Sequence, residues 1–210
     1  MKESRKKHAL SAAAMTAGLA LITFFAYATK TPPFHTSTSI QADEVCTSLG
    51  DSPEVLPALK IVLPKGQEYS FWDKSIPNRT QRSIRLLCLA STSSDRSEMT
   101  LGGRVIPKLK SDEWLAWLKG DFNEEVKRES LTSFKAGDDA AASSRGAGIQ
   151  IPCFANKRTP NPQENIHISI SLTNGSDAGA EKTRKALIDI LRSSAAHAHK
   201  EMKCDLPSKL

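Results

Sequence analysis

Short catalytic and nucleotide-binding motifs are missing from the sequence. It contains no G-x-S-x-G nucleophile elbow, no P-loop and no complete G-x-G-x-x-G, since Gly146-Ala147-Gly148 lacks the third glycine. The cysteines form no C-x-x-C pair and show none of the short spacings of zinc ligands. We therefore assign no catalytic, cofactor-binding or metal-binding residue from the sequence, and we expect no cofactor.

Charged residues are absent from residues 9–29, which read ALSAAAMTAGLALITFFAYAT. An uncharged run of about 20 residues is long enough to cross a membrane as a helix. Residues 1–8 carry four basic residues against one acidic, whereas the other flank begins with Lys30 alone. Since basic residues stay on the cytoplasmic side, this pattern predicts a single-pass protein of the cell membrane with a cytoplasmic tail, residues 1–8, and an extracytoplasmic C-terminal part.

A cleaved signal peptide is the alternative to this anchor. Ala26-Tyr27-Ala28 matches an A-x-A cleavage site, and cleavage near Ala28 would secrete the rest of the chain. The uncharged run exceeds the usual apolar core of a signal peptide, about 7–15 residues, which favours a retained signal anchor. No cysteine directly follows the run, so the sequence does not indicate a lipoprotein anchor. Both alternatives export the same domain.

A large basic excess is also missing from the exported part. The formal charge of the chain is +6, and residues 1–8 contribute +3 of it (four basic minus one acidic), which leaves +3 for the rest. A nucleic-acid interface needs basic residues gathered in a run or on one face. No such run is visible in the exported part, so the sequence predicts no nucleic-acid partner.

The four cysteines, Cys46, Cys88, Cys153 and Cys204, all lie in the exported part. An even number of cysteines in an oxidising compartment predicts two disulfides. Three pairings are possible, and the sequence alone does not choose among them. We favour the sequential pairing, Cys46–Cys88 and Cys153–Cys204, because each disulfide would join a helical region to a strand. In the chain-entropy model, loops of this length would each contribute roughly 4 kcal/mol to stability.

The exported part reads as a linker followed by one folded domain. Residues 30–41, KTPPFHTSTSIQ, contain Pro32-Pro33 and a Ser/Thr run without apolar periodicity, which is typical of a linker. Residues 42–210 predict a single α+β domain, an antiparallel sheet with about three helices. Helices are expected at 51–63, 111–122 and 187–202, and strands at 69–72, 83–91, 99–106, 149–154 and 166–172.

Turn and strand signals give four local expectations. Residues 76–81 contain Pro77-Asn78 and are expected to form a polar turn. Gly102-Gly103 is expected to bulge or bend its strand. Residues 135–148, KAGDDAAASSRGAG, are expected to form a loop without obvious core contribution. Pro152 indicates that the strand at 149–154 is an edge strand.

Two polar clusters are candidate sites, each with a plainer interpretation. His197 and His199 lie near the end of the last helix, but side chains two residues apart point to different faces, which favours surface histidines over a metal pair. Glu201, four residues after His197, does not complete a metal site. Asp138 and Asp139 could bind a cation or act as acid and base, but no calcium-loop pattern surrounds them, which favours a solvated loop.

A pair of tryptophans, Trp114 and Trp117, is the remaining candidate. The two rings could form an aromatic platform for a ligand or touch the bilayer. Helical spacing makes core packing the plainer interpretation for Trp114, and Trp117 is expected to be the more exposed of the two.

Short segments of the exported part carry a resemblance to known sequences. They are Cys46-Thr47-Ser48-Leu49, Ser70-Phe71-Trp72-Asp73-Lys74, Leu131-Thr132-Ser133-Phe134 with Ala136-Gly137-Asp138, and the C-terminal Cys204-Asp205-Leu206-Pro207-Ser208-Lys209-Leu210. On these segments the chain resembles a family of uncharacterised membrane-anchored or exported actinobacterial proteins. The cysteine spacing is also similar to that of actinobacterial exported lipoprotein and sensor domains, although the lipid-anchor cysteine is missing. Neither resemblance implies an activity or a site residue.

The anchor, the linker, the cysteines and the missing catalytic motifs favour a membrane-tethered extracytoplasmic module that binds without catalysis. Its partner would be an envelope protein, an envelope polymer or a small ligand. Two alternatives remain: an accessory subunit of a membrane complex, or an envelope hydrolase or transferase whose site residues meet only in three dimensions. A cleft joining Asp138 or Asp139 to a histidine would favour the enzyme.

Overall fold

The structure is a computed structural model of the chain, and it describes residues 40–51, 53–93, 97–122, 124–155 and 163–210. These residues belong to one compact unit, Ser39–Leu210. The expected cytoplasmic tail, the uncharged run at 9–29 and most of the linker lie outside the described residues. Within the described part of the chain, no helix is both long enough and apolar enough to span a membrane.

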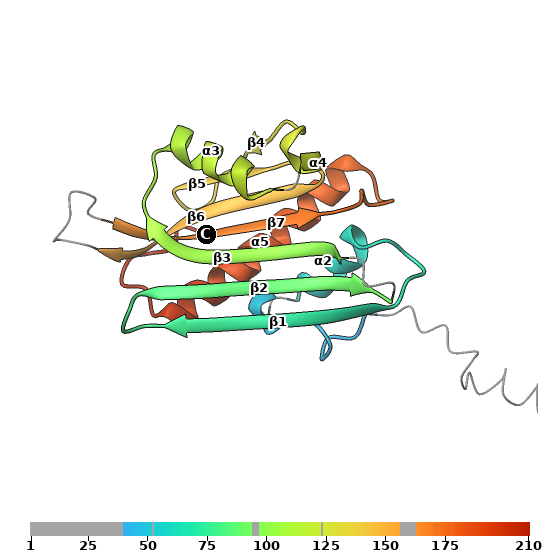
Figure 1. The fold of residues 1–210 in the computed structure, drawn as a ribbon, viewed down its shortest axis with the longest axis horizontal. Helices are drawn as coiled ribbons and strands as arrows, with labels where there is room; N and C mark the ends of the chain where they lie inside the picture. The colour runs from blue at the N-terminus through green and yellow to red at the C-terminus, as the bar shows by residue number, and fades with distance from the viewer. Residues whose placement is uncertain (1–39, 52, 94–96, 123, 156–162) are drawn as a thin grey trace, which may run out of the picture. The chain divides into compact units, whose positions relative to one another are not determined.

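Seven strands form one antiparallel sheet in the order β1-β2-β3-β7-β6-β5-β4 (Figure 1). Strands β1 to β3 form one meander, β4 to β6 form a second, and β7 joins them by pairing with both β3 and β6. The strands are Tyr69–Asn78 (β1), Ser83–Thr92 (β2), Ser97–Pro107 (β3), Thr132–Ser133 (β4), Asp139–Ala142 (β5), Gly146–Ala155 (β6) and Gln163–Leu172 (β7). The predicted α+β fold with an antiparallel sheet is confirmed.

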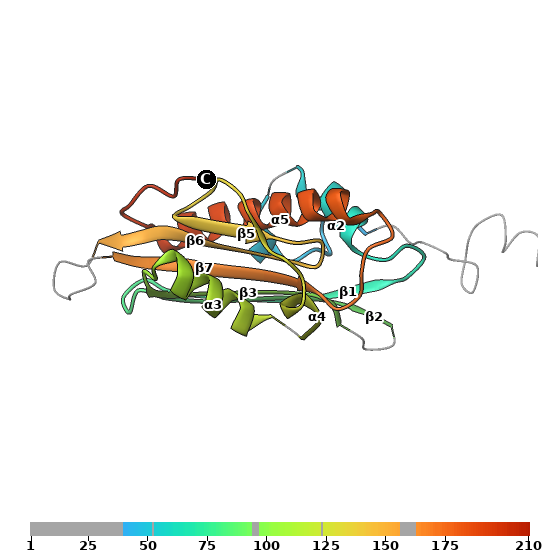
Figure 2. The same cartoon turned by 90° about the horizontal axis from the view of Figure 1, so that it is seen from above.

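Helices pack on both faces of this sheet. The described helices are the short 3-10 helix Thr47–Leu49 (η1) and the α-helices Val55–Val62 (α2), Ser111–Asp121 (α3), Glu124–Lys127 (α4) and Ala180–Met202 (α5). Helices α2 and α5 lie on one face, which we call the inner face, and α3 and α4 lie on the other, the outer face (Figure 2). The three predicted helices correspond to α2, α3 and α5, whereas α4 adds one further turn.

The main core lies between the inner face of the sheet and α5. Alternation along β7 places Ile166, Ile168, Ile170 and Leu172 on the inner face, where they are fully buried. The apolar stripe that the sequence predicts on α5, comprising Leu187, Leu191, Ala195, Ala198 and Met202, is also buried. Each fully buried aliphatic side chain in this strand–helix contact contributes about 1.5–3 kcal/mol to stability.

Two disulfides fasten the edges of the core. Cys46–Cys88 joins the residue before η1 to β2, and Cys153–Cys204 joins β6 to the segment just after α5. This is the sequential pairing that the sequence analysis favours, with each disulfide linking a helical region to a strand. The carbonyl of Cys153 also accepts hydrogen bonds from the backbone N–H groups of Asp205 and Leu206, so the C-terminal tail is held along β6.

Residues 135–148 are not a loop without core contribution, so that prediction is wrong. They contain β5 and the beginning of β6, and Ala140, Ala141, Ala142 and Ala147 are buried. The sheet is packed on both faces here: Ala140 and Ala142 belong to the main core, whereas Ala141 packs with the residues of α3. Alanine side chains are small enough to fit between the sheet and the helices packed on its two faces. Because alanine is only weakly hydrophobic, the sequence shows no clear apolar pattern for this strand.

Three other local expectations also need correction. Strand β1 continues through residues 76–78, and the turn lies at 79–82. Gly102-Gly103 pairs on both sides without a register shift, so it forms no bulge. Strand β6 lies inside the sheet between β7 and β5, and Pro152 is accommodated by a register shift in the pairing with β7. Such a shift allows a residue without an N–H group to occupy an interior strand.

On the outer face, α3 packs against β6 through two glycines. Leu118 and Phe122 of this helical segment, together with Val126 of α4, form a second small core. A Cβ atom added to Gly148 would lie 2.2 Å from Cδ1 of Leu118, and one added to Gly146 would lie 2.5 Å from Cγ1 of Val126. The close approach of α3 at Gly148 and of α4 at Gly146 therefore requires glycine at these positions.

We expect Gly148→Ala to destabilise the domain. The added Cβ would also lie 3.0 Å from Cγ of Leu118, which rotation about χ2 does not move. Because Leu118 is fully buried, its side chain has little room to move away, so the helix or its neighbours must shift. Overpacking of this kind costs about 1–3 kcal/mol, measured as the free energy of unfolding in urea.

The matched control is Gly120→Ala in α3, where an added Cβ meets no atom within 4 Å. Alanine should leave stability unchanged or raise it by up to about 1 kcal/mol, because it favours the helix. Equal losses in the two variants would contradict the proposed role of the glycine contact.

Candidate functional site

Three rows of side chains cross the outer face, because strands in register place opposite residues side by side. From β6 to β1 the rows are Gly146, Ser171, Thr100, Leu89 and Trp72; then Gly148, Ser169, Gly102, Leu87 and Lys74; then Gln150, His167, Arg104, Arg85 and Ile76. Side chains in the first two rows are small on β6 and large on β1. The side chains of the outer face therefore extend further from the sheet towards the β1 edge than they do on β6.

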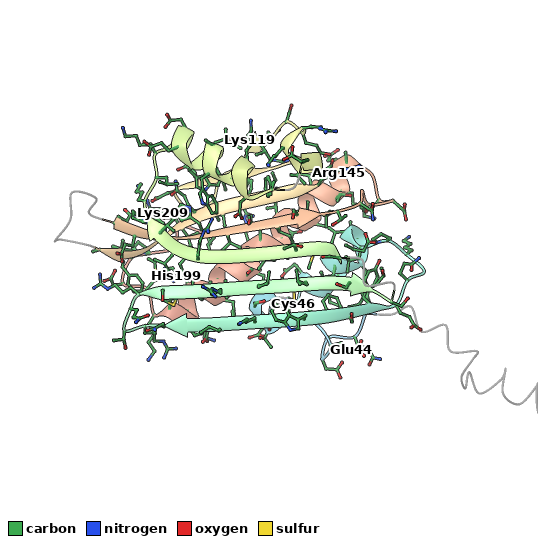
Figure 3. All side chains as sticks on the ribbon, viewed as in Figure 1. Glu44, Cys46, Lys119, Arg145, His199 and Lys209 are labelled. Atoms are coloured by element: carbon green, nitrogen blue, oxygen red, sulfur yellow. A yellow bond between two sulfur atoms is a disulfide. The ribbon has the colours of Figure 1, made fainter. Side chains whose placement is uncertain are left out.

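Helices cover only the half of this outer face where the side chains of the sheet are small. Helices α3 and α4 lie over the half of the sheet that contains β5 and β6, and no described helix lies in front of β1 and β2 (Figure 1). Figure 3 shows the same view with side chains, where Lys119 marks α3 on the covered half. Trp72 and Ile76 of β1 are 51% and 49% exposed. We call the outer surface of β1, β2 and β3 the open face.

A hollow of about 580 Å³ lies where the open face meets α3. Its lining includes Ile76, Arg85, Gly102, Arg104, Trp117 and His167, which come from β1, β2, β3, α3 and β7. Gly102 places no side chain in the middle of its row, so the backbone of β3 forms part of the floor. Binding sites for small molecules occupy about 300–1,000 Å³, and this hollow falls within that range.

Two arginines stand directly opposite each other at this hollow, Arg85 on β2 and Arg104 on β3. The guanidinium of Arg104 lies 3.4 Å from the carboxylate of Asp121 and 5.3 Å from the ring centroid of Trp117. Arg85 has no hydrogen bond or ion pair with any residue that the structure describes. Like charges directly opposite on neighbouring strands repel. Asp121 is the one acidic residue that lines the hollow and it pairs with Arg104 alone, so the described residues leave the charge of Arg85 unneutralised.

His167 lies buried in the wall of the hollow, beside Trp117. The two rings meet edge to face with centroids 5.0 Å apart, and neither ring nitrogen has a hydrogen-bond partner among the described residues. Burial, with a smaller contribution from the charge of Arg104, lowers the pKa of His167 to about 3. The imidazole is therefore neutral at neutral pH. A buried polar group without a partner costs about 1–3 kcal/mol, which the packing around it must offset.

The neighbouring Ser169 and Asp121 do not form a catalytic triad with this histidine. The hydroxyl of Ser169 donates directly to the carboxylate of Asp121. In a Ser-His-Asp triad the imidazole stands between the other two groups, whereas His167 bonds neither. Gln150 stands between His167 and Asp139 in their cross-strand row, and its amide donates to Asp139. The described residues therefore place no acid–base pair of the kind that the hydrolase alternative requires.

Asp138 lies in an ion-pair cluster with two partly exposed lysines and not in a solvated loop. Its side chain is 4% exposed, 2.9 Å from Nζ of Lys108 and also paired with Lys209. Burial raises the pKa of Asp138, but the ammonium groups of Lys209 and Lys108 and the amide of Asn165 outweigh it and lower the pKa to about 2. The carbonyl of Lys209 accepts a hydrogen bond from the N–H of Gly137. The cluster therefore fastens the C-terminal tail to the sheet.

The two histidines of α5 are not brought together with a third ligand. Nε2 of His199 lies 2.7 Å from the carbonyl oxygen of Leu206, which ties the tail back onto the helix. His197 lines a separate shallow hollow with Asp189, while Glu201 pairs with an arginine of the β1–β2 turn. Within the described ranges, no three His, Cys, Asp or Glu side chains lie where they could hold a metal ion together.

The two tryptophans differ in burial as the sequence analysis expects, with Trp117 the more exposed of the two. Trp114 is buried in the small core under α3, whereas Trp117 is half-buried at the rim of the hollow. The glycine-containing segment Gly146-Ala147-Gly148 lies in β6 beneath α3, where it allows close packing and does not open a helix.

Comparison of the chain with protein-family models, with curated proteins and with solved structures finds no match. The interpretation of the open face therefore depends on its own geometry and chemistry.

Sequence reasoning missed Arg85, Arg104 and Asp121 as site residues. One signal was present in β2, where Leu87 and Leu89 share a face with Arg85 although the opposite face is already apolar. Apolar residues on both faces of a strand indicate a second contact surface. No comparable signal pointed to Arg104 or Asp121, because β3 and α3 bring them together only through tertiary packing.

We expect His167 to make the domain less stable in mild acid. The imidazole has a usual pKa of 6.5 and a folded pKa of about 3, so the unfolded chain binds the extra proton between these values. The free energy of unfolding should therefore fall as the pH drops from about 6.5 towards 3. His167→Leu should reduce this slope, as measured by urea unfolding at several pH values between 7 and 4. An unchanged slope would contradict the assignment.

Asp138 should act in a lower pH window. Its usual pKa is 3.8 and its folded pKa is about 2, so its contribution is present above pH ~4 and is lost as the pH falls through this interval. Asp138→Asn should lower the free energy of unfolding at pH 7 and should narrow its difference from the unmodified protein near pH 2. Asp43→Asn, an exposed carboxylate, is the control and should leave stability at pH 7 within about 0.5 kcal/mol.

Proposed function

We propose that the chain is a membrane-tethered extracytoplasmic module that binds its ligand or partner on the open face without catalysing a reaction. The carrying observation is the open face itself, where Trp72 and Ile76 are exposed and Ile76 lines a hollow with Arg85, which has no carboxylate partner among the described residues. Large apolar side chains exposed on one face of a domain favour an interaction site. The absence of an acid–base pair among the described residues of this hollow supports binding over catalysis.

The membrane tether is supported by the sequence and the extracytoplasmic location by the disulfides. The uncharged run at 9–29 and the basic residues before it fit a signal anchor with a cytoplasmic N-terminus. Disulfides persist in oxidising compartments, and both pairs of cysteines in the domain are bonded. Secretion after cleavage near Ala28 would place the same binding face outside the cell.

An accessory subunit of a membrane complex is the second candidate. The exposed side chains of β1 lie at an edge of the sheet, where a partner protein could also dock. The two candidates differ in what occupies the open face: a protein subunit in one case, and a small ligand or polymer in the other.

A photoreactive side chain on the open face tests this proposal. We expect the full-length protein carrying benzoyl-phenylalanine at Leu87 to give a discrete adduct when its own cells are irradiated. The same group at Lys182, which is exposed on α5 on the other side of the sheet, should not give that adduct. Mass spectrometry of the adduct would then separate a protein subunit from a small ligand or polymer.

Identical adducts at Leu87 and Lys182, or an adduct at Lys182 alone, would contradict a binding role for the open face. The location of the domain is checked in the same cells. Protease added to spheroplasts should degrade residues 42–210 while a cytoplasmic marker stays intact. Protection of the domain from protease would overturn the extracytoplasmic placement.

A further inference from the structure

We infer that the occupant of the hollow is a single-chain amphiphile with an acidic headgroup, which rests on the proposed function of the open face and names its ligand class. The acidic group lies in the hollow between Arg85 and Arg104. The chain leaves the hollow along the outer face of β2, over Leu87 and Leu89, which lie outside the lining of the hollow. The inference depends on three observations: the paired arginines, the apolar residues next to them, and the size of the hollow.

The charge of the hollow selects an anion. Arg85 and Arg104 face each other across β2 and β3, and Asp121 neutralises Arg104 alone. Stacking over Trp117 holds the guanidinium of Arg104 towards α3. Lys74 adds a third cation to the open face and has no partner among the described residues. A carboxylate between the two guanidinium groups would relieve their repulsion and accept charge-assisted hydrogen bonds.

The surface beside the arginines selects an apolar chain. Leu87 and Leu89 follow Arg85 at alternate positions on the outer face of β2, so they form a line about 14 Å long from Arg85 to Leu89 at about 3.4 Å per residue. Trp72 lies opposite Leu89 at the far end of this line. Gly102 lies opposite Leu87 and has no side chain, so no side chain of β3 stands beside Leu87 at this position. An extended alkyl chain would cover the side chains that are now exposed to water.

The size of the hollow suits the headgroup end of a small molecule. Its volume of about 580 Å³ falls within the usual range of small-molecule sites. His167, a buried polar residue in the wall of the hollow, has no hydrogen-bond partner among the described residues. Its imidazole adds hydrogen-bonding capacity next to the arginines without adding a charge.

The test is calorimetric titration of decanoate into the full-length protein in phosphatidylcholine nanodiscs, with empty nanodiscs as the blank for partition into lipid. We expect saturable binding of one decanoate per chain. Decanol, which keeps the chain and lacks the charge, should bind about tenfold more weakly or worse, because a charged hydrogen bond is lost. Acetate, which keeps only the headgroup, should show no saturable binding at the same concentrations.

Matched variants test the role of the arginine. Arg85→Gln should weaken decanoate binding by about tenfold or more, while Arg85→Lys should retain part of the affinity through its charge. Lys182→Gln removes the same charge from α5 and should bind as the unmodified protein does. Leu87→Asn should weaken decanoate and decanol alike, because it shortens the apolar line. Arg85 and Lys182 are exposed and Leu87 is half-buried, and a thermal melt checks that each variant is folded.

Two results would overturn the ligand class. One is equal affinity for decanol and decanoate with no effect of Arg85→Gln. The other is the absence of saturable decanoate binding to the folded protein. Neither result removes the proposed function, because a specific adduct at Leu87 in cells would still establish the open face as a binding surface. A protein adduct at Leu87 would replace the amphiphile by a partner with an acidic docking segment.

Discussion

The close packing of α3 on a glycine-lined part of the sheet is the constraint on which the rest of the structure depends. Across one row of the outer face the side chains grow from Gly146 through Ser171 and Thr100 to Leu89 and Trp72. A helix can pack closely where the row has glycine and serine, and it cannot pack equally closely where the row has leucine and tryptophan. The same gradient therefore produces both the covered half and the open face.

The candidate site forms at the step between the two halves. Trp117 and Asp121 belong to the last turns of α3, and they contact the guanidinium of Arg104 as the helix passes along β3 and β7. This contact pairs Arg104 and leaves its opposite neighbour Arg85 without a carboxylate among the described residues. The position of α3 thus decides which arginine is paired, and the glycines of β6 decide the position of α3. The charge left on Arg85 in the hollow therefore depends on how α3 packs against the glycines of β6.

The sequence predicted the parts of the fold where one period dominates. Strand β7 alternates strictly and α5 has a continuous apolar stripe, so both were recognised, and the two disulfides have the pairing that the sequence favoured. Strand β5 was not predicted from the sequence, because its alanines give only a weak hydrophobic pattern although they are packed between two layers. The site escaped for a different reason: Arg85, Arg104 and Trp117 come from three elements, and only the sheet register and the packing of α3 bring them together.

The state of His167 gives the strongest physical argument for binding over catalysis. A general base needs a pKa near the working pH and a hydrogen bond to the group whose proton it takes. His167 has a pKa of about 3, is fully buried, and bonds neither Ser169 nor Asp121. The neighbouring Ser169 hydroxyl is directed to a carboxylate that also serves Arg104. In this arrangement the polar groups of the hollow present fixed charges and dipoles, which fit the proposed binding of an anion.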